Sequence, residues 1–434
     1  MSKRTLLLPF GVRIQAADVF LVLALFVFIY NPRLYLPVSP YFLLTLMSLG
    51  MLLTIYSRPF TEAIKQPTMQ IFLGLLALTL ADTALIGLLS HFDLQPSYFI
   101  ISTMAAALPC ALMLSIFAVR RRFSLIHFLN IVLAVGMVQV GIIIASLLMP
   151  GLRLWIIQGS GSQQVEALVE RVGIFRVYGL SEGYSFELPL FQGLCVIISY
   201  VLGGRQSARY YVLIPFYLLS IAVNARVALI SLFIAPLVDM VLQVRSRPFK
   251  QMTRLAAALI VVSSAAWLVQ FKAVNSDRVN SWTWLYSAYL DIQNFVRGDV
   301  APTMDDLGTR MWFAPETVDL LLGSGVNVYS QAGRRSDIGY VVYLHYGGLV
   351  YSFLLYAAYA WIILRPVGRQ PLVGAMKLMF LVFLFFSNAK GSVFMPTPLT
   401  KGILLVMVFL LVQEIASRLP REKSGESGVA LPAG

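Results

Sequence analysis

SLIHFLNIVLAVGMVQVGIIIASLLM, residues 124–149, contains no Asp, Glu, Lys or Arg. About 20 consecutive apolar residues in an α-helix cross a bilayer core, because the helix satisfies its own backbone hydrogen bonds. The stretch therefore predicts a transmembrane helix. Segments of about ten residues with alternating polarity, which would indicate a membrane β-barrel, do not occur in the chain.

Composition extends this prediction to the whole chain. Hydrophobic residues make up 59% of the 434 residues and charged residues 12%, whereas soluble domains are about half apolar and about a quarter charged. Apolar runs separated by charged connections predict an all-α polytopic membrane protein with about twelve spans. The spans are expected near Ala17–Leu36, Pro40–Tyr56, Met69–Ser90, Ser97–Val119, Ser124–Met149, Phe186–Leu202, Tyr210–Asn224, Val227–Val244, Leu255–Phe271, Gly339–Leu364, Pro371–Phe386 and Thr400–Ala416.

Basic residues between the spans predict the orientation. Lys and Arg gather in every second connection, for example at 120–122 and 245–254, on the side that also holds both termini. The positive-inside rule makes that side cytoplasmic, so we expect a multi-pass protein of the inner membrane. The formal charge of +13 then reflects topology. A nucleic-acid interface is the other explanation of such a charge, but it would need one concentrated basic face.

The whole chain, 1–434, is expected to form a single transmembrane domain. Two larger loops, 150–185 and 272–338, would lie on the outer face. Within the second loop, Asp277–Val296 contains several Trp and Tyr residues and predicts a helix lying in the membrane interface. Residues 421–434 are polar and contain Gly and Ser, which is typical of a flexible tail, here on the cytoplasmic side.

Signatures of soluble enzymes are missing from the sequence. It contains neither a Gly-rich phosphate loop with Lys-Ser/Thr nor an HExxH motif. The three histidines, His91, His127 and His345, are scattered, so we expect no metal site and no cofactor. Cys110 and Cys195 lie inside apolar runs, where cysteine behaves as a small hydrophobic residue.

Three arginines of the predicted outer face stand out. Arg176 lies in the first loop, Arg310 in the second, and Arg226 between two spans joined by a very short connection. The planar guanidinium forms paired, charge-assisted hydrogen bonds with phosphate oxygens. We therefore predict that these arginines bind the diphosphate groups of substrates. The alternative is that each one anchors a loop at the membrane interface.

Four local patterns support a resemblance to a known family. In its spans, its inside termini and its larger outer loop before the tenth span, the chain resembles the Wzy-type O-antigen and capsular polysaccharide polymerases, relatives of the O-antigen ligases. Within the patterns, the residues expected to support the site are Gly179, Gly323, Gly325, Gly339 and Tyr340. The patterns are RVYGLSEGYSFELPL (176–190), NARVALISLF (224–233), RMWFAPETVDLLLGSG (310–325) and SDIGYVVYLHYGGLVYS (336–352).

The resemblance implies a membrane glycosyltransferase of GT-C-like architecture that uses no metal and no cofactor. It would join oligosaccharide repeat units carried on undecaprenyl diphosphate into O-antigen, capsular polysaccharide or exopolysaccharide, at the periplasmic face of the bacterial inner membrane. Its implied partners are these lipid-linked oligosaccharides, membrane lipids, and a chain-length regulator and flippase of the same pathway, but no nucleic acid. In the ligase branch a His-Asn pair opens the corresponding helix. This chain has Ser336 and Asp337 there, which favours a polymerase over a ligase.

Asp337 and His345 are the predicted catalytic residues. A sugar hydroxyl is a poor nucleophile until its proton is accepted. Asp337 stands where the second outer loop re-enters the membrane, so we expect it to accept this proton or to orient the hydroxyl. His345 follows about two helical turns later and could support Asp337 or serve instead. The alternative role of Asp337 is that of a helix N-cap.

Other classes of function stay open beside the polymerase. An O-antigen ligase-like glycosyltransferase would use similar substrates, and a non-enzymatic membrane scaffold would need no site. A transporter, such as a polysaccharide flippase or a proton-coupled exporter, would use Asp82, because an intramembrane carboxylate is costly and usually functional. The large outer loop and the absence of two similar six-helix halves in the sequence favour the glycosyltransferase.

Overall fold

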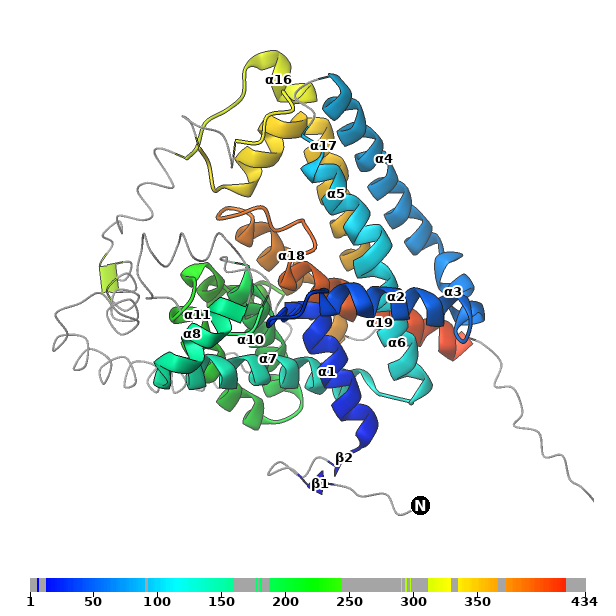
Figure 1. The fold of residues 1–434 in the computed structure, drawn as a ribbon, viewed down its shortest axis with the longest axis vertical. Helices are drawn as coiled ribbons and strands as arrows, with labels where there is room; N and C mark the ends of the chain where they lie inside the picture. Colours follow the sequence, from blue (N-terminus) through cyan, green and yellow to red (C-terminus); the bar gives the residue numbers. More distant parts are fainter. Residues whose placement is uncertain are drawn as a thin grey trace, which may run out of the picture.

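The structure is a computed structural model, and helices dominate it (Figure 1). Among the described residues, the remaining regular structure is one antiparallel pair of two-residue strands, β1 (Leu6–Leu7) and β2 (Arg13–Ile14). The helical class agrees with the prediction. The structure describes residues 6–7, 13–89, 93–159, 177, 179–181, 187–242, 290, 293–294, 297, 311–328, 335–365 and 371–418.

The helices are named in chain order, with η marking π- and 3-10-helical segments. They are α1 (Ala16–Tyr30), α2 (Pro40–Leu53), α3 (Ser57–Ile64), α4 (Pro67–Leu89), α5 (Gln95–Ser102), η1 (Thr103–Ala107), α6 (Leu108–Arg120), α7 (Leu125–Leu148), α8 (Pro150–Gly159), α10 (Leu188–Arg205), η2 (Ala208–Leu213), α11 (Ile214–Ala222), η3 (Arg226–Ile230), α12 (Ser231–Val241), α16 (Thr317–Leu322), α17 (Gly339–Leu364), α18 (Pro371–Ser387) and α19 (Pro398–Arg418).

Among the described residues, six helices are long and apolar enough to cross a membrane. They are Pro67–Leu89, Gln95–Arg120, Leu125–Leu148, Leu188–Arg205, Gly339–Leu364 and Pro398–Arg418. The pair α2 and α3, bent by 94°, is a seventh candidate if it forms one span, and further apolar helices are shorter. Helices overlap every predicted span except Leu255–Phe271, which lies outside the described residues. A polytopic membrane protein is thus supported.

Caps and prolines set several helix ends. Ser124 precedes α7, and its hydroxyl accepts a hydrogen bond from His127 N at 3.2 Å. Ser39 caps α2 in the same way, and Pro40 occupies the first turn, where a backbone N–H is not needed. α5 continues through the π-helical turn η1 into α6, so that Gln95–Arg120 forms one apolar helix.

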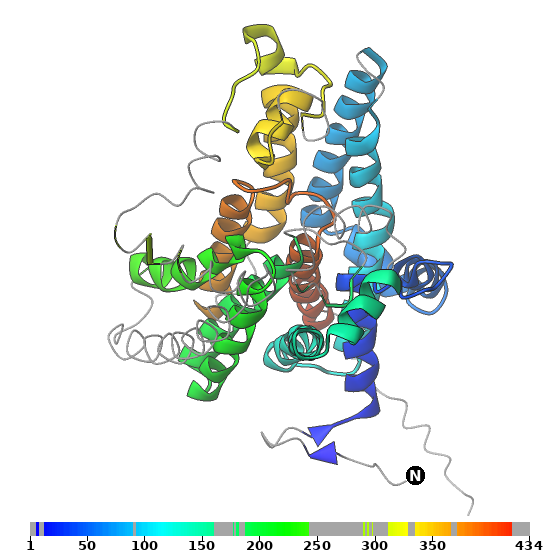
Figure 2. The ribbon, with the colours of Figure 1, turned by 60° about the vertical axis from the view of Figure 1, so that its left-hand side comes forward.

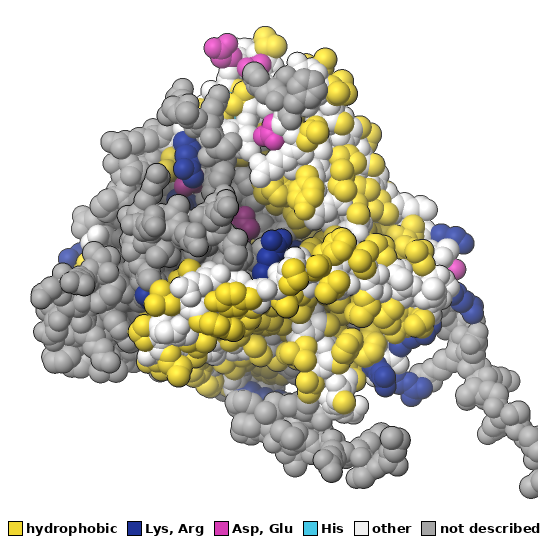
Figure 3. Space-filling model, in the orientation of Figure 1, with side chains coloured by type: hydrophobic (Ala, Val, Ile, Leu, Met, Phe, Trp, Pro, Cys, Tyr) yellow, Lys and Arg dark blue, Asp and Glu magenta, His cyan; other side chains and the backbone are white. Residues whose placement is uncertain are grey.

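Two helices lie at the centre of the molecule. α10 and α19 are 89% and 83% buried over their most apolar windows, whereas α4 is only 33% buried. Figure 2 shows α19, in red, between the upright pair α4 and α5 and the α10–α12 region in green. Cys195 of α10 and Cys110 of α6 are fully buried. Apolar side chains also cover much of the surface over α2, α7 and α8 (Figure 3), as expected where lipid replaces water.

Polar contacts join the ends of several helices. At the end predicted to face outward, Tyr35 N donates to Gly159 O at 2.6 Å and Gly339 N to Asn388 O at 2.9 Å. At the other end, Arg365 pairs with Glu414 at 2.6 Å. We call these ends outer and inner, after the predicted orientation.

α17 is interrupted at Gly348, whose backbone (φ 65°, ψ −161°) is not helical. The break frees the carbonyls of the preceding turn. A loop after α16 satisfies them, because Ser324 N donates to His345 O and Gly325 N to Tyr346 O, each at 2.9 Å. Non-helical backbone at membrane depth requires such partners.

Candidate functional site

Asp337 lies two residues before α17, at the outer end, and is half-buried. Its Oδ1 is 3.5 Å from Arg335 Nε, and within the described part of the chain this oxygen has no hydrogen-bond partner. The N-cap of α17 is Ile338, without a side-chain cap. The side-chain hydrogen bond at this turn comes from Ser336, whose hydroxyl accepts from Ile338 N at 3.1 Å. The alternative that Asp337 caps the helix is therefore wrong, and its carboxylate is available for another role.

The structure does not join His345 to Asp337. His345 Nε2 lies 3.3 Å from the carbonyl oxygen of Phe313, whose ring centroid is 4.8 Å from the imidazole. Eight residues correspond to a rise of about 12 Å along a helix, too far for a hydrogen bond. His345 therefore belongs to the packing of the second outer loop against α17, and whether it acts in catalysis stays a prediction.

Gly323 and Gly325 build the junction between this loop and the break in α17. Both have positive φ, 78° and 71°. A Cβ on Gly323 would collide with Tyr346 O, and a Cβ on Gly348 would collide with Leu321 O. These glycines allow two backbones to approach closely, and this packing explains their presence without a direct substrate contact.

Gly339 and Tyr340 also have packing roles. A Cβ on Gly339 would collide with the Asn388 side chain and Gly391 O. The Tyr340 hydroxyl donates to Phe385 O at 2.6 Å. Both residues fasten the start of α17 to the end of α18. The α18–α19 connection fills the space beside Gly339.

Segment 177–181 docks onto the outer ends of α7 and α11. Val177 is fully buried, and its N–H donates to Val223 O at 3.2 Å. Gly179 (φ 66°) lies against Gln139, whose side chain hydrogen-bonds both the N–H and the carbonyl of Leu180, at 3.3 and 3.2 Å. Val177 of the RVYG pattern therefore contacts Val223, the residue directly before the NAR pattern.

The predicted diphosphate-binding arginines are only partly covered by the structure. Arg226 is the first residue of η3 and follows the break between α11 and η3. Its side chain lies outside the described part. Arg176 and Arg310 lie outside the described residues altogether. Beside Arg226, Asn224 is 1% exposed, and its Oδ1 has no hydrogen-bond partner among the described residues. A buried acceptor without a partner is costly, so this break differs from an ordinary turn.

Sequence reasoning missed a buried cation at the outer end. Lys401, near the start of α19, is 7% exposed, and its Nζ lies 3.9 Å from the ring centroid of Tyr41 and 5.9 Å from that of Phe28. Glu187, just before α10, is close enough to interact with it. Burial raises the pKa of Glu187 to about 7, and Lys401 opposes this shift. The sequence does contain an indication of this site, because a lysine inside an apolar run usually has a function.

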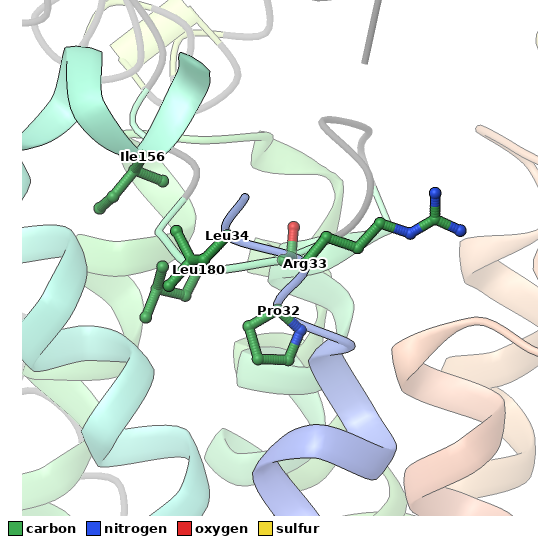
Figure 4. Close-up of a pocket in the computed structure, with 6 residues that line it drawn as sticks. Pro32, Arg33, Leu34, Ile156 and Leu180 are labelled. Carbon is green, nitrogen blue, oxygen red and sulfur yellow. The ribbon is translucent and has the colours of Figure 1, made fainter. Parts of the chain in front are cut away.

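A shallow depression lies between the α1–α2 connection, α8 and residues 180–181. Figure 4 shows Arg33 at its rim, with the guanidinium extending away from Ile156 and Leu180. In the connection, Asn31, Leu34 and Tyr35 have positive φ, at 47°, 28° and 56°, a strain that often marks functional segments.

Other predicted candidates lie elsewhere. Asp82 is half-buried in α4, and its Oδ2 has no hydrogen-bond partner in the described part of the chain. His127 pairs with Asp18 at 2.9 Å at the inner end, and His91 is outside the described residues. Within the described residues, His, Cys, Asp and Glu side chains form no group of three that could hold a metal ion. The predicted metal independence stays a prediction.

Comparison of the chain with protein-family models, with curated proteins and with solved structures finds no match.

Proposed function

We propose that the protein is a membrane glycosyltransferase that polymerises oligosaccharide repeat units carried on undecaprenyl diphosphate. In this proposal it has about twelve spans in a GT-C-like arrangement, lies in the bacterial inner membrane with both termini in the cytoplasm, and acts at the periplasmic face. The product is O-antigen, capsular polysaccharide or exopolysaccharide.

The observation that carries the proposal is the docking of Val177 on Val223. It joins two segments that were selected from the sequence for their arginines and that lie in different parts of the chain. Arg176 directly precedes the first contact residue, and Arg226 follows the second by three positions. In this proposal the guanidinium groups of Arg176 and Arg226 bind one diphosphate, whose oxygens accept paired hydrogen bonds.

The outer end offers positive charge for the departing group. In the proposed reaction the acceptor hydroxyl forms a new bond to the anomeric carbon of the donor sugar, and the bond from that carbon to the lipid diphosphate breaks. The diphosphate leaves with the electron pair. The three predicted arginines, Arg176, Arg226 and Arg310, would stabilise the charge of the diphosphate. Lys401, whose Nζ lies 3.9 Å from the ring centroid of Tyr41, adds to the positive potential of this end.

Asp337 is proposed to receive the proton of the acceptor hydroxyl. Its Oδ1 accepts no hydrogen bond within the described residues, and Arg335 Nε lies 3.5 Å from it. A carboxylate at the start of α17 is suited to general-base work.

The test is a reconstituted assay with lipid-linked repeat units. Asp337→Asn should leave the unfolding temperature near wild type, while single lipid-linked units accumulate and polymer falls at least about a hundredfold. Glu316→Gln, which changes an exposed acid of the same outer loop, is the matched control and should polymerise normally. Undiminished polymer from Asp337→Asn together with an inactive His345→Ala would transfer the role to His345.

Asp82 supports one second candidate, a proton-coupled transporter. Its unpartnered Oδ2 in α4 is the kind of intramembrane carboxylate on which proton coupling depends. The purified protein in proteoliposomes should show no proton-coupled flux, and Asp82→Asn should polymerise like wild type. A flux that disappears in Asp82→Asn would favour the transporter.

A further inference from the structure

Three consecutive arginines, 120–122, end α6 at the inner end of the molecule, and all three are exposed. They lie beside α3, because Arg120 Cζ is 4.7 Å from the ring centroid of Tyr56, the residue before that helix. α3 contributes a further exposed arginine, Arg58. We call Arg58 and 120–122 the basic corner. Figure 3 shows Lys and Arg side chains gathered along this edge of the molecule.

Arg122 occupies a position that suits glycine better. Its φ is 60°, in the left-handed region, which is strained for a side-chain-bearing residue. Arg122 N donates to Val119 O at 2.9 Å, and Phe123 N donates to Ala118 O at 3.1 Å. These two bonds form a Schellman motif, in which the left-handed position is usually Gly. Ending the helix therefore does not require an arginine here.

Among the described residues, no ion pair involves the arginines at 120–122. The nearby Asp18 is already engaged, because it accepts from His127 at 2.9 Å and from Gln15 N at 2.8 Å. The negative end of the helix dipole favours a cation in the last turn, which accounts for Arg120 but not for the strained Arg122.

Apolar side chains lie next to the corner. Leu53 and Ile55, just before Tyr56, are 68% and 60% exposed. They stand at the elbow where the chain turns by 94° from α2 into α3. Arginines beside exposed apolar side chains match a ligand with an anionic head and a hydrocarbon tail, whereas a soluble anion would gain nothing from Leu53 and Ile55.

We propose that the basic corner binds the phosphate headgroup of an anionic phospholipid of the inner leaflet, with its acyl chains against the α2–α3 elbow. Arg120 is oriented by the Tyr56 ring, and Arg121 Cζ lies 5.5 Å from the ring centroid of Phe117. Stacking of this kind fixes guanidinium groups at low entropic cost. The site is independent of the proposed glycosyl transfer.

The full chain, purified in a neutral detergent, is titrated with phosphatidylglycerol and with phosphatidylcholine of the same acyl chains, and bound lipid is counted by native mass spectrometry. The preference for phosphatidylglycerol should fall roughly fivefold for each corner charge removed. Arg122→Gly should lower this preference about fivefold, while its unfolding temperature equals or exceeds that of wild type, because the strain is relieved. Arg122→Lys should keep most of the preference.

The matched control is Arg209→Gln, which removes an exposed inner-end arginine lying 5.6 Å from the Tyr210 ring centroid. It should bind phosphatidylglycerol like wild type. An unchanged preference in both Arg122→Gly and the double variant Arg120→Gln/Arg121→Gln would overturn the proposal. An equal loss in Arg209→Gln, or the same thermal stabilisation by inorganic phosphate at equal concentration, would also overturn it, in favour of general charge or a soluble anion.

Discussion

The molecule contains two breaks in helical backbone that are built in opposite ways. At Gly348 in α17, the freed carbonyls receive hydrogen bonds from Ser324 and Gly325. At the break between α11 and η3, Asn224 is left with a buried oxygen that has no partner in the described part of the chain. A satisfied break serves the fold, whereas an unsatisfied polar group in a buried break is a cost that folding alone does not explain.

The first prediction concerns the satisfied break and has the largest expected effect. Gly348→Ala should destabilise the protein by about 3 kcal/mol or more, because the new Cβ collides with Leu321 O at a positive φ. Thermal unfolding of the purified protein measures this loss. Gly74→Ala is the control, because no atom lies within 4 Å of its Cβ, and it should be slightly stabilised. Equal unfolding temperatures for Gly348→Ala and wild type would remove the distinction between the breaks.

The second prediction concerns the other break. Arg226→Ala should reduce polymer synthesis roughly a hundredfold without changing the unfolding temperature, because the proposed diphosphate contact is lost. Arg226→Lys should recover little activity, since lysine lacks the planar fork. Chain-length ladders of the glycan provide the measurement, with Arg209→Ala as the control. Normal ladders from Arg226→Ala would make it an interfacial anchor.

The third prediction compares two buried asparagines. The Asn388 side-chain amide nitrogen donates to Gly391 O at 3.1 Å, and its oxygen accepts from Tyr340 N at 3.3 Å and from the Tyr356 hydroxyl at 3.1 Å. Asn388→Leu should cost about 2–3 kcal/mol, because these partners lose their hydrogen bonds. Asn224→Leu should change the unfolding free energy by less than about 1 kcal/mol yet impair polymer synthesis. Similar stability losses in both variants would show that Asn224 is structural.

The fourth prediction has the smallest effect and concerns pH. The pKa of Glu187 in the folded protein is about 7, above its ordinary value of 4.5, so the folded state favours the protonated form. This contribution to stability is complete below the unfolded pKa and is lost as the pH rises through about 7. The unfolding temperature should fall by a few degrees between pH 5 and pH 8. Glu187→Gln should flatten this dependence, and an unchanged slope would contradict it.

Much of the helical layout follows from apolar periodicity. The span predicted at 124–149 is the helix Leu125–Leu148, because length and lack of charge leave no other structure at membrane depth. The 94° elbow before α3 was missed, since eight residues of mixed polarity give a weak signal. The break in α17 was also missed, because it depends on a loop more than twenty residues away in sequence.

The site was less predictable than the fold. Asp337 was selected from its place at the start of a span, but the N-cap position falls on Ile338, and the N–H of Gly339 is already bonded to Asn388 O. The packing role of the glycines was not predictable from the sequence, because the atoms that they approach, Tyr346 O for Gly323 and Leu321 O for Gly348, come from tertiary packing. Docking of Val177 on Val223 could not be predicted, because nothing local encodes a contact between distant segments.

The burial of both native cysteines has a practical consequence for mapping the protein in intact cells. Cys110 and Cys195 are 0% exposed, so a membrane-impermeant maleimide should find no target in the wild-type chain, which becomes its own unlabelled reference. A single cysteine at Glu316 or at Ser57, exposed at opposite ends of the molecule, would then report its compartment directly. Because the native thiols are buried, cysteines introduced at the helix ends can all be tested with the same reagent.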